Sequence, residues 1–145
     1  QPPADAPYCL NRSAPCPGLL LNLPENRKIY KIMSDCIFCK IAGHEINAKF
    51  VLETDELAAF QDLNPQAPTH ILIIPKRHIA KLSDCSPEDA ALLGRIQLAA
   101  KDIAEKAGVA DGYRLVTNNG RKAGQSVDHL HYHLLGGRKM NWPPG

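Results

Sequence analysis

Three of the six histidines in this 145-residue sequence stand at every second position, as His129, His131 and His133. In an extended strand alternate side chains point to the same face, so the three imidazoles would share one face, about 7 Å apart. Leu130 and Tyr132, between them, would point to the other face and pack on the core. A strand with one apolar face and one imidazole face indicates a site for chemistry.

Two kinds of chemistry fit three histidines on one face. They can share one metal ion, as in zinc enzymes with three histidine ligands, or one neutral imidazole can be a nucleophile while its neighbours orient it and bind an anion. The preceding loop favours the nucleophile. Gly120 and Gly124 allow backbone N–H groups to turn toward an anion, and Asn118 and Ser126 add hydrogen-bonding side chains. These residues predict a phosphate site beside His131.

The elements that would position this loop are short strands and two helices. Apolar and β-branched runs predict strands, and an apolar stripe that follows a capping box, Ser86 with Asp89, predicts a long helix over 86–108. Because most strands are joined by short links, we predict an α+β fold with a five-stranded antiparallel sheet. The strands are expected at 49–53, 56–63, 69–75, 113–118 and 127–135, and a short helix at 36–43.

The charge distribution separates the first 33 residues from the rest. Residues 1–33 carry four Lys or Arg and two Asp or Glu, whereas the remaining residues carry thirteen of each. A body without basic excess does not fit proteins that bind nucleic-acid backbones. No apolar run approaches the roughly 18 residues that a membrane span needs. We therefore expect neither nucleic acid nor a membrane as a partner.

The first 32 residues look foreign to the fold that follows. They hold six prolines, show no periodicity and lack the order of segments of a signal peptide. We expect a non-native or disordered leader over 1–32, with Met33 as the natural start, and one domain over 33–145; the alternative is a genuine flexible arm. Cys9 and Cys16 lie in this leader. Five cysteines form no disulfide framework of a secreted protein, which favours a cytoplasmic setting.

The motif His-Leu-His-Tyr-His-Leu-Leu, residues 129–135, resembles the His-x-His-x-His-x-x signature of the histidine-triad superfamily. Residues 60–79, 111–138 and 140–145 are similar to its Hint branch, the histidine-triad nucleotide-binding proteins. The resemblance covers the chain from Ser34 to its end. It implies the HIT-like fold, in which two five-stranded sheets join across a twofold axis into one ten-stranded sheet.

The resemblance also implies an enzyme that hydrolyses the P–N bond of purine nucleoside phosphoramidates, of the adenosine 5′-monophosphoramidate type, without a catalytic cofactor. His131 would attack the phosphorus and form a covalent nucleotidyl-histidine, which water then cleaves. His133 and Ser126 would assist, Asp62 would hold the ribose hydroxyls, and the role of His70 is left open. The implied nucleotide-binding residues are Phe60, Asp62, Leu63, Asn118, Gly124, Gln125, Ser126 and His133.

Cys36 and Cys39 form a CxxC pair, which on its own indicates a redox pair or a coincidence. Many bacterial histidine-triad proteins use such a pair as half of a zinc site, and their other ligands match His78 and His129. The resemblance thus implies a structural Zn²⁺ on these four residues. A closed Cys₂His₂ set leaves no open position for water, which argues against a metal-dependent hydrolase.

A homodimer is implied by the resemblance and has support in the sequence. A small antiparallel sheet leaves an edge strand, which pairing across a twofold axis removes. Leu92, Leu98 and Ala99 lie outside the main apolar stripe of the long helix and predict a second surface to bury. Trp142, on the C-terminal tail, matches a tryptophan that lies beside the other subunit's site in zinc-free relatives.

Two other classes of function stay open. A nucleotide-binding regulatory or scaffolding protein, with incidental turnover, would use the same pocket residues. A metal-dependent hydrolase would lose activity when a chelator is added. The leaving amine, the base preference and the pathway do not follow from the sequence.

Overall fold

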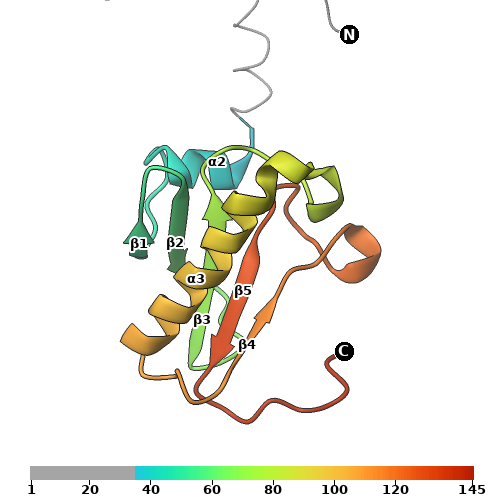
Figure 1. Ribbon diagram of the computed structural model, residues 1–145. Coiled ribbons are helices and arrows are strands. Elements are labelled where there is room, and N and C mark those ends of the chain that lie inside the picture. The colour runs from blue at the N-terminus through green and yellow to red at the C-terminus, as the bar shows by residue number, and fades with distance from the viewer. Residues whose placement is uncertain (1–34) are drawn as a thin grey trace, which may run out of the picture.

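The computed structural model describes residues 35–145 (Figure 1). The expected leader at 1–32, with its two cysteines, and Met33 lie outside these residues. The elements in chain order are α2 (Ile37–Ala42), β1 (Phe50–Glu53), β2 (Leu57–Gln61), β3 (Thr69–Pro75), α3 (Ala90–Lys106), β4 (Tyr113–Val116) and β5 (Tyr132–Gly136), with 3-10 turns at Leu82–Asp84, Pro87–Asp89 and Arg121–Ala123.

The five strands form one antiparallel sheet in the order β1-β2-β3-β5-β4, which confirms the predicted fold class. The first three strands are a meander, and β5 lies between β3 and β4. The long helix α3 crosses one face of the sheet (Figure 1). None of the helices in the described residues is long and apolar enough to cross a membrane.

Strand β3 is the middle strand of the sheet, and both of its faces are buried. Ile71 and Ile73 pack under α3, whereas Leu72 and Ile74 belong to a second apolar cluster with Phe38 of α2. A strand covered on both faces is expected to be a continuous apolar run, as the sequence from 69 to 75 is. The sheet therefore separates an α3 side from an α2 side.

The long helix starts where the capping box predicts, although its first turn, Pro87–Asp89, is a 3-10 turn. The second apolar surface predicted on it is wrong for Leu92 and Ala99, which are 7% and 8% exposed and face the sheet. A helix on a core buries a band at least about 100° wide, and both residues fall inside it. Leu98 alone of the three is exposed.

The last strand is shorter than predicted: β5 begins at Tyr132, so two of the triad histidines precede it. In the register of the β3–β5 pair, Leu130 falls opposite Pro75, which has no N–H to continue the ladder. The N–H of Leu130 bonds instead to the carbonyl of Ile79, at 2.6 Å. The alternation still holds, because Leu130 and Leu134 pack on the α3 side.

Candidate functional site

The triad histidines lie on the α2 side of the sheet and are largely buried. His129 is 0% exposed and His131 4%, whereas His133 is half-buried. Phe38 of α2 covers the first two, with ring centroids 5.9 Å from that of His129 and 5.2 Å from that of His131. The rings of His131 and His133 are 5.0 Å apart. The three side chains thus share one face but have different neighbours.

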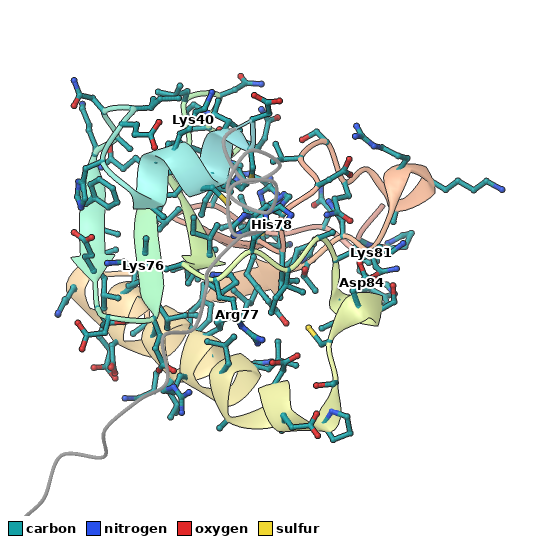
Figure 2. The ribbon with its side chains drawn as sticks, turned by 90° about the horizontal axis from the view of Figure 1, so that it is seen from above. Lys40, Lys76, Arg77, His78, Lys81 and Asp84 are labelled. Atoms are coloured by element: carbon teal, nitrogen blue, oxygen red, sulfur yellow. The ribbon has the colours of Figure 1, made fainter. Side chains whose placement is uncertain are left out.

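Cys36, Cys39, His78 and His129 form the first group, here called the thiol–histidine cluster, with all ligand atoms within 4.8 Å of one another. The two cysteines are at the start of α2, where a spacing of three places them on one side of the turn. His78 comes from the segment after β3 (Figure 2). Its Nδ1 lies 3.3 Å from Cys39 Sγ and 3.2 Å from His129 Nδ1, and Cys36 Sγ lies 3.4 Å from His129 Nδ1.

The chemistry of this cluster fits Zn²⁺. His129 Nε2 lies 2.8 Å from the carbonyl oxygen of Pro75, which can only accept, so Nε2 carries the proton and Nδ1 turns its lone pair into the cluster. A carbonyl partner of this kind is typical of metal-binding histidines. Tetrahedral zinc would separate its N and S ligand atoms by about 3.3–3.8 Å. Four distances between ligand atoms in the cluster, from 3.2 Å for His78 Nδ1 to His129 Nδ1 up to 3.5 Å for Cys39 Sγ to His129 Nδ1, are close to that range.

Burial sets the protonation of this cluster in the absence of a cation. Burial, and then the hydrogen bond and charge of Cys36, raise the pKa of Cys39 to about 12. Burial also lowers the pKa of His129 to about 4, against the opposing bond to Pro75. A bound cation reverses this order for thiols, because it stabilises the thiolate.

His131 presents its Nε2 lone pair. Its Nδ1 lies 2.7 Å from the carbonyl oxygen of His129, so Nδ1 carries the proton and Nε2 carries the lone pair. The Thr117 hydroxyl donates to the carbonyl oxygen of His131, at 2.9 Å, and fixes the backbone at this point. The ring is therefore held by its far nitrogen, as a nucleophilic imidazole requires.

Asp62, His70 and His133 form the second group, here called the acid–histidine cluster. The N–H of Gln66 donates to His70 Nδ1, at 3.0 Å, so the proton of a neutral His70 is on Nε2. That nitrogen lies 2.9 Å from His133 Nδ1 and 3.4 Å from Asp62 Oδ2. His70 thus donates to His133, which leaves the Nε2–H of His133 as a donor. A protonated ring nitrogen cannot bind a metal, so this cluster is a hydrogen-bond chain.

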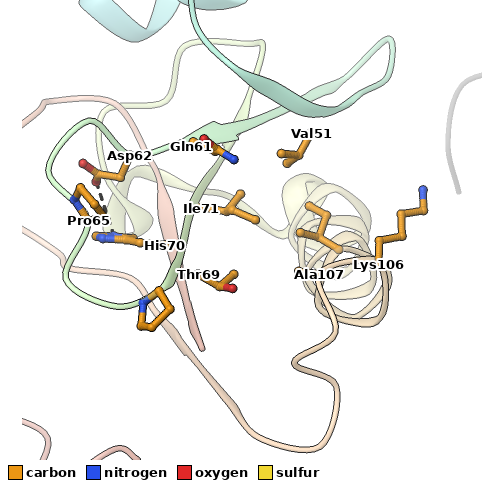
Figure 3. Close-up of a pocket in the computed structure, with 11 residues that line it drawn as sticks. Val51, Gln61, Asp62, Pro65, Thr69, His70, Ile71, Lys106 and Ala107 are labelled. Atoms are coloured by element: carbon orange, nitrogen blue, oxygen red, sulfur yellow. Dashed lines mark ion pairs between the residues drawn. The ribbon is translucent and has the colours of Figure 1, made fainter. Parts of the chain in front are cut away.

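His70 and His133, the two histidines of the acid–histidine cluster, are neutral near pH 7. Burial lowers the pKa of His70 although the charge of Asp62 acts in the opposite direction. Burial, and then the neighbouring histidines, lower the pKa of His133 to about 4. The contact between Asp62 and His70 (dashed in Figure 3) is therefore a polar contact with a neutral ring.

A cavity of about 250 Å³ opens beside His131, between α2 and the sheet. Leu63 stands at its rim with its side chain 99% exposed, whereas Phe60 is buried in its wall. Asn118 and Gly124 do not line it; Gly124 turns the loop with a φ of +92° close to Asn118. The predicted residues that line the cavity are Phe60, Asp62, Leu63, Ser126, His131 and His133.

The Gln125 side chain is only 3% exposed and lies inside the protein. Its amide nitrogen donates to the carbonyl oxygens of Ala80, at 2.7 Å, and Val127, at 2.9 Å. Its amide oxygen accepts from the N–H of Gly120, at 2.8 Å. Both amide hydrogens are used within the protein, so this side chain braces the loop instead of pointing into the cavity.

A larger cavity, of about 360 Å³, lies between the end of α3 and the start of β3 (Figure 3). It touches Asp62 and His70 at one end and Lys106 at the other. None of His131, His133 and Ser126 lines it. The smaller cavity is therefore the candidate active site.

Sequence reasoning missed the groups that fix the orientation of the histidines. Phe38 stands between the two cysteines of the CxxC pair and could have been suspected from that place. The carbonyl of Pro75 and the N–H of Gln66 are backbone groups, for which no residue type gives a signal. Trp142 is 84% exposed on a tail where Asn141 accepts a hydrogen bond from Arg114.

Comparison with known proteins places the chain in a family. The HIT domain family matches residues 43–140, a range that leaves out both cysteines of the thiol–histidine cluster. An uncharacterised HIT-like protein of Synechocystis sp. is 54% identical over 111 residues, which cover 77% of this chain and 97% of that protein.

Two solved structures are similar to the chain along most of its length. A HIT family hydrolase from Legionella pneumophila has 53% identity and a TM-score of 0.76, over 77% of this chain and all of that one. A histidine triad nucleotide-binding protein from Candida albicans has 38% identity and a TM-score of 0.65, over 75% of this chain and 83% of that one. The chain, with its five-stranded sheet and its histidine triad, belongs to the HIT domain family.

Proposed function

We propose that this protein hydrolyses purine nucleoside phosphoramidates to the nucleoside monophosphate, through a covalent nucleotidyl intermediate on His131. The observation that carries the proposal is the orientation of this ring. The bond from Nδ1 to the carbonyl of His129 leaves the lone pair on Nε2, and the ring lines a cavity beside a hydroxyl and a donor imidazole. The similarity to a HIT family hydrolase and to a histidine triad nucleotide-binding protein supports this class of reaction.

The reaction has two displacements at phosphorus. In the first, His131 Nε2 attacks, an Nε2–P bond forms, the P–N bond breaks, and the amine leaves with a proton. The amine takes this proton from solvent, because a neutral His133 is not an acid near pH 7. The Nε2–H of His133 can donate a hydrogen bond to a phosphate oxygen, because His70 occupies its Nδ1. In the second, water attacks the phosphorus and releases a proton to solvent, the Nε2–P bond breaks, and the mononucleotide leaves. The Ser126 hydroxyl, which lines the same cavity, is available to a phosphate oxygen.

The rest of the cavity suits a nucleoside. Phe60 gives an apolar wall, and a purine that covered Leu63 would remove a fully exposed leucine from water. Asp62 already accepts the N–H of Asn64, at 2.8 Å, but a carboxylate has about four acceptor positions, which leaves room for two ribose hydroxyls. Asn118 and Gly124 would shape the loop beside the phosphate.

We propose that the thiol–histidine cluster holds one structural Zn²⁺ per chain. The ion would join α2 to the segment that carries the triad and would supply no open position for water, because four protein ligands complete its shell. Its role is therefore to hold His129, and with it the carbonyl that orients His131. Cys36, Cys39 and Cys85 are free thiols, which is consistent with a cytoplasmic setting.

We further propose a homodimer in which the tail of one subunit reaches the site of the other. The β4 strand is an edge of the sheet, and Trp142 exposes a large aromatic surface that a partner would cover. Sedimentation should give twice the chain mass of 15.9 kDa. A monomer at micromolar concentration would contradict this arrangement.

The test of the reaction is to trap its intermediate. Enzyme in excess is mixed with an adenosine phosphoramidate and quenched in base, where a phosphorus–imidazole bond survives, and the protein is digested for mass spectrometry. AMP attached to His131 is expected. Product without an adduct, or an adduct on another residue, would refute the mechanism. Binding of AMP without turnover would favour the regulatory alternative, and rapid loss of activity with a chelator would favour a metal-dependent hydrolase.

A further inference from the structure

Three consecutive residues after β3 contact three different parts of the site. His78 places its ring in the thiol–histidine cluster. The carbonyl of Ile79 accepts the N–H of Leu130, between the first two triad histidines, at 2.6 Å. The carbonyl of Ala80 accepts the side-chain amide of Gln125, at 2.7 Å. A displacement of His78 would therefore be passed, within two residues, to the segment that carries the triad, residues 129–133, and to the loop at residues 118–126, here called the catalytic loop.

The bond from Gln125 to Ala80 is the buried part of this connection. Gln125 lies directly before Ser126, and it closes the loop on itself through Gly120 and Val127. Because this amide is almost completely buried, no water replaces a bond that it loses, and displacement of Ala80 would leave buried polar groups unpaired. The position of Ser126 is thus tied to the position of the segment that carries His78.

We propose that Gln125 is a positioning residue that couples the thiol–histidine cluster to the catalytic loop, so that Zn²⁺ and a nucleotide bind cooperatively. The inference rests on the proposed function, which places the nucleotide beside Ser126. Metal binding fixes His78, the chain from His78 to Ala80 fixes Gln125, and Gln125 fixes the loop before the nucleotide arrives. Coupling between two binding sites is reciprocal, so a bound nucleotide tightens metal binding by the same factor.

A second tie between the loop and the neighbouring segment provides a matched control. The side chain of Asn119 accepts the N–H of Ser83, at 2.8 Å. This bond joins the same loop to residues that carry no ligand of the thiol–histidine cluster, and it is exposed. Removal of Asn119 should therefore loosen the loop without breaking its connection to His78.

The experiment measures Zn²⁺ affinity of the metal-free protein by competition with a chromophoric chelator, with and without saturating AMP. In the wild type, AMP should tighten Zn²⁺ binding by about fivefold or more, the usual range of coupling between sites. In Gln125→Met, which keeps the length of the side chain but loses its polar groups, the factor should fall to about one. Gln125→Glu, which keeps the acceptor for Gly120 and loses the amide donor, should behave in the same way. Asn119→Ala should retain the wild-type factor.

The factor is a ratio of two affinities of one variant, so a general loss of stability cancels from it. With a phosphoramidate as substrate, the Zn²⁺-loaded Gln125→Met should lose kcat more than it raises KM, because Ser126 is displaced at the reacting phosphate. Equal Zn²⁺ affinity with and without AMP in the wild type would overturn the coupling and leave the proposed function intact. Retention of the factor by Gln125→Glu would overturn the role of the amide. A wild type that fails to bind AMP would overturn both.

Discussion

His129 and His133 stand four residues apart in one motif, yet they enter clusters of different kinds. Each cluster brings histidines together with acid or thiol groups, and in each the candidate ligand atoms lie within 4.8 Å of one another. In the thiol–histidine cluster a carbonyl, that of Pro75, occupies the outer nitrogen of His129. In the acid–histidine cluster an N–H, that of Gln66, occupies the outer nitrogen of His70.

This difference in backbone partner decides what each cluster can bind. A carbonyl accepts a hydrogen bond from the outer nitrogen of the ring, which keeps its proton, and the inner nitrogen then presents a lone pair. The inner nitrogen of His129 therefore offers an electron pair to a cation. A donating N–H leaves the proton facing inward, so the second cluster alternates donors and acceptors and ends in a donor for an anion. Residue types and distances alone do not distinguish a metal site from a hydrogen-bond chain; the tautomers do.

The largest effect should come from the residue between the two clusters. His131 takes its orientation from the backbone of His129 and lies with its ring 5.0 Å from that of His133. His131→Ala should lower kcat by about a thousandfold or more, because a covalent nucleophile has no substitute. AMP affinity, measured by calorimetry, should stay within a factor of a few. A variant that keeps more than about a tenth of the activity, a loss below roughly 1.4 kcal/mol, would remove His131 from this role.

The second prediction separates the clusters by metal content. His78→Gln should lose the bound Zn²⁺, whereas His70→Gln should keep one per chain, since only the first cluster presents lone pairs. Loss of a structural zinc should cost about 3 kcal/mol or more and lower Tm by about 10 °C or more. Elemental analysis and calorimetry on protein purified without chelators measure both quantities. Equal zinc loss in the two variants, or no zinc in the wild type, would contradict the assignment of the zinc site to the thiol–histidine cluster alone.

The sequence predicted the sheet, the long helix and the histidine face, because these depend on periodic patterns of residue types. It did not predict that β5 starts after His131, since that depends on Pro75 in another strand lying opposite Leu130. It also assigned Gln125 to the nucleotide, whereas the side chain is used by Ala80, Val127 and Gly120. A backbone carbonyl or N–H is present in almost every residue, so residue types do not predict which of these groups a side chain will contact. Such contacts are known only from the fold.

The third prediction tests the hydrogen-bond chain. His70→Leu removes the donor to His133 Nδ1 and should lower kcat by about ten- to a hundredfold, about 1.4–2.7 kcal/mol. His70→Gln places an amide donor near the same point and should restore most of that loss. Steady-state kinetics of both variants, with their zinc content measured in parallel, is sufficient. If the two variants have the same activity, the ring of His70 contributes only packing, and the hydrogen bond from His70 to His133 has no part in the reaction.

The fourth prediction concerns pH. The pKa of His133 is about 4 in the folded protein and 6.5 in the unfolded reference, so between these values the unfolded state binds more protons. The contribution of His133 to stability should thus be complete above pH 6.5 and decline as the pH falls toward 4. Ring nitrogen and carbon NMR shifts should show a neutral ring, protonated at Nε2, down to about pH 5. A titration midpoint of His133 near pH 6.5 would contradict its lowered pKa. A proton on Nδ1 of His133 would contradict the hydrogen bond in which His70 is the donor and His133 the acceptor.

The smallest effect should come from residues 140–145 of the C-terminal tail, which form no hydrogen bond or ion pair with the residues of either cluster. Trp142 is 84% exposed in the single chain, and its neighbour Asn141 is held by Arg114 of the edge strand β4. If the tail completes the partner's site near the leaving amine, deletion of residues 140–145 should change the preference among amines by a few-fold. Zinc content and the NMR signals of His133 should not change, because both clusters are complete within one chain. The measurement is kcat/KM for a series of adenosine phosphoramidates that differ only in the amine, on truncated and full-length protein. A truncation that lowers all values equally would assign the tail to stability, and an unchanged series would leave Trp142 without a role in specificity.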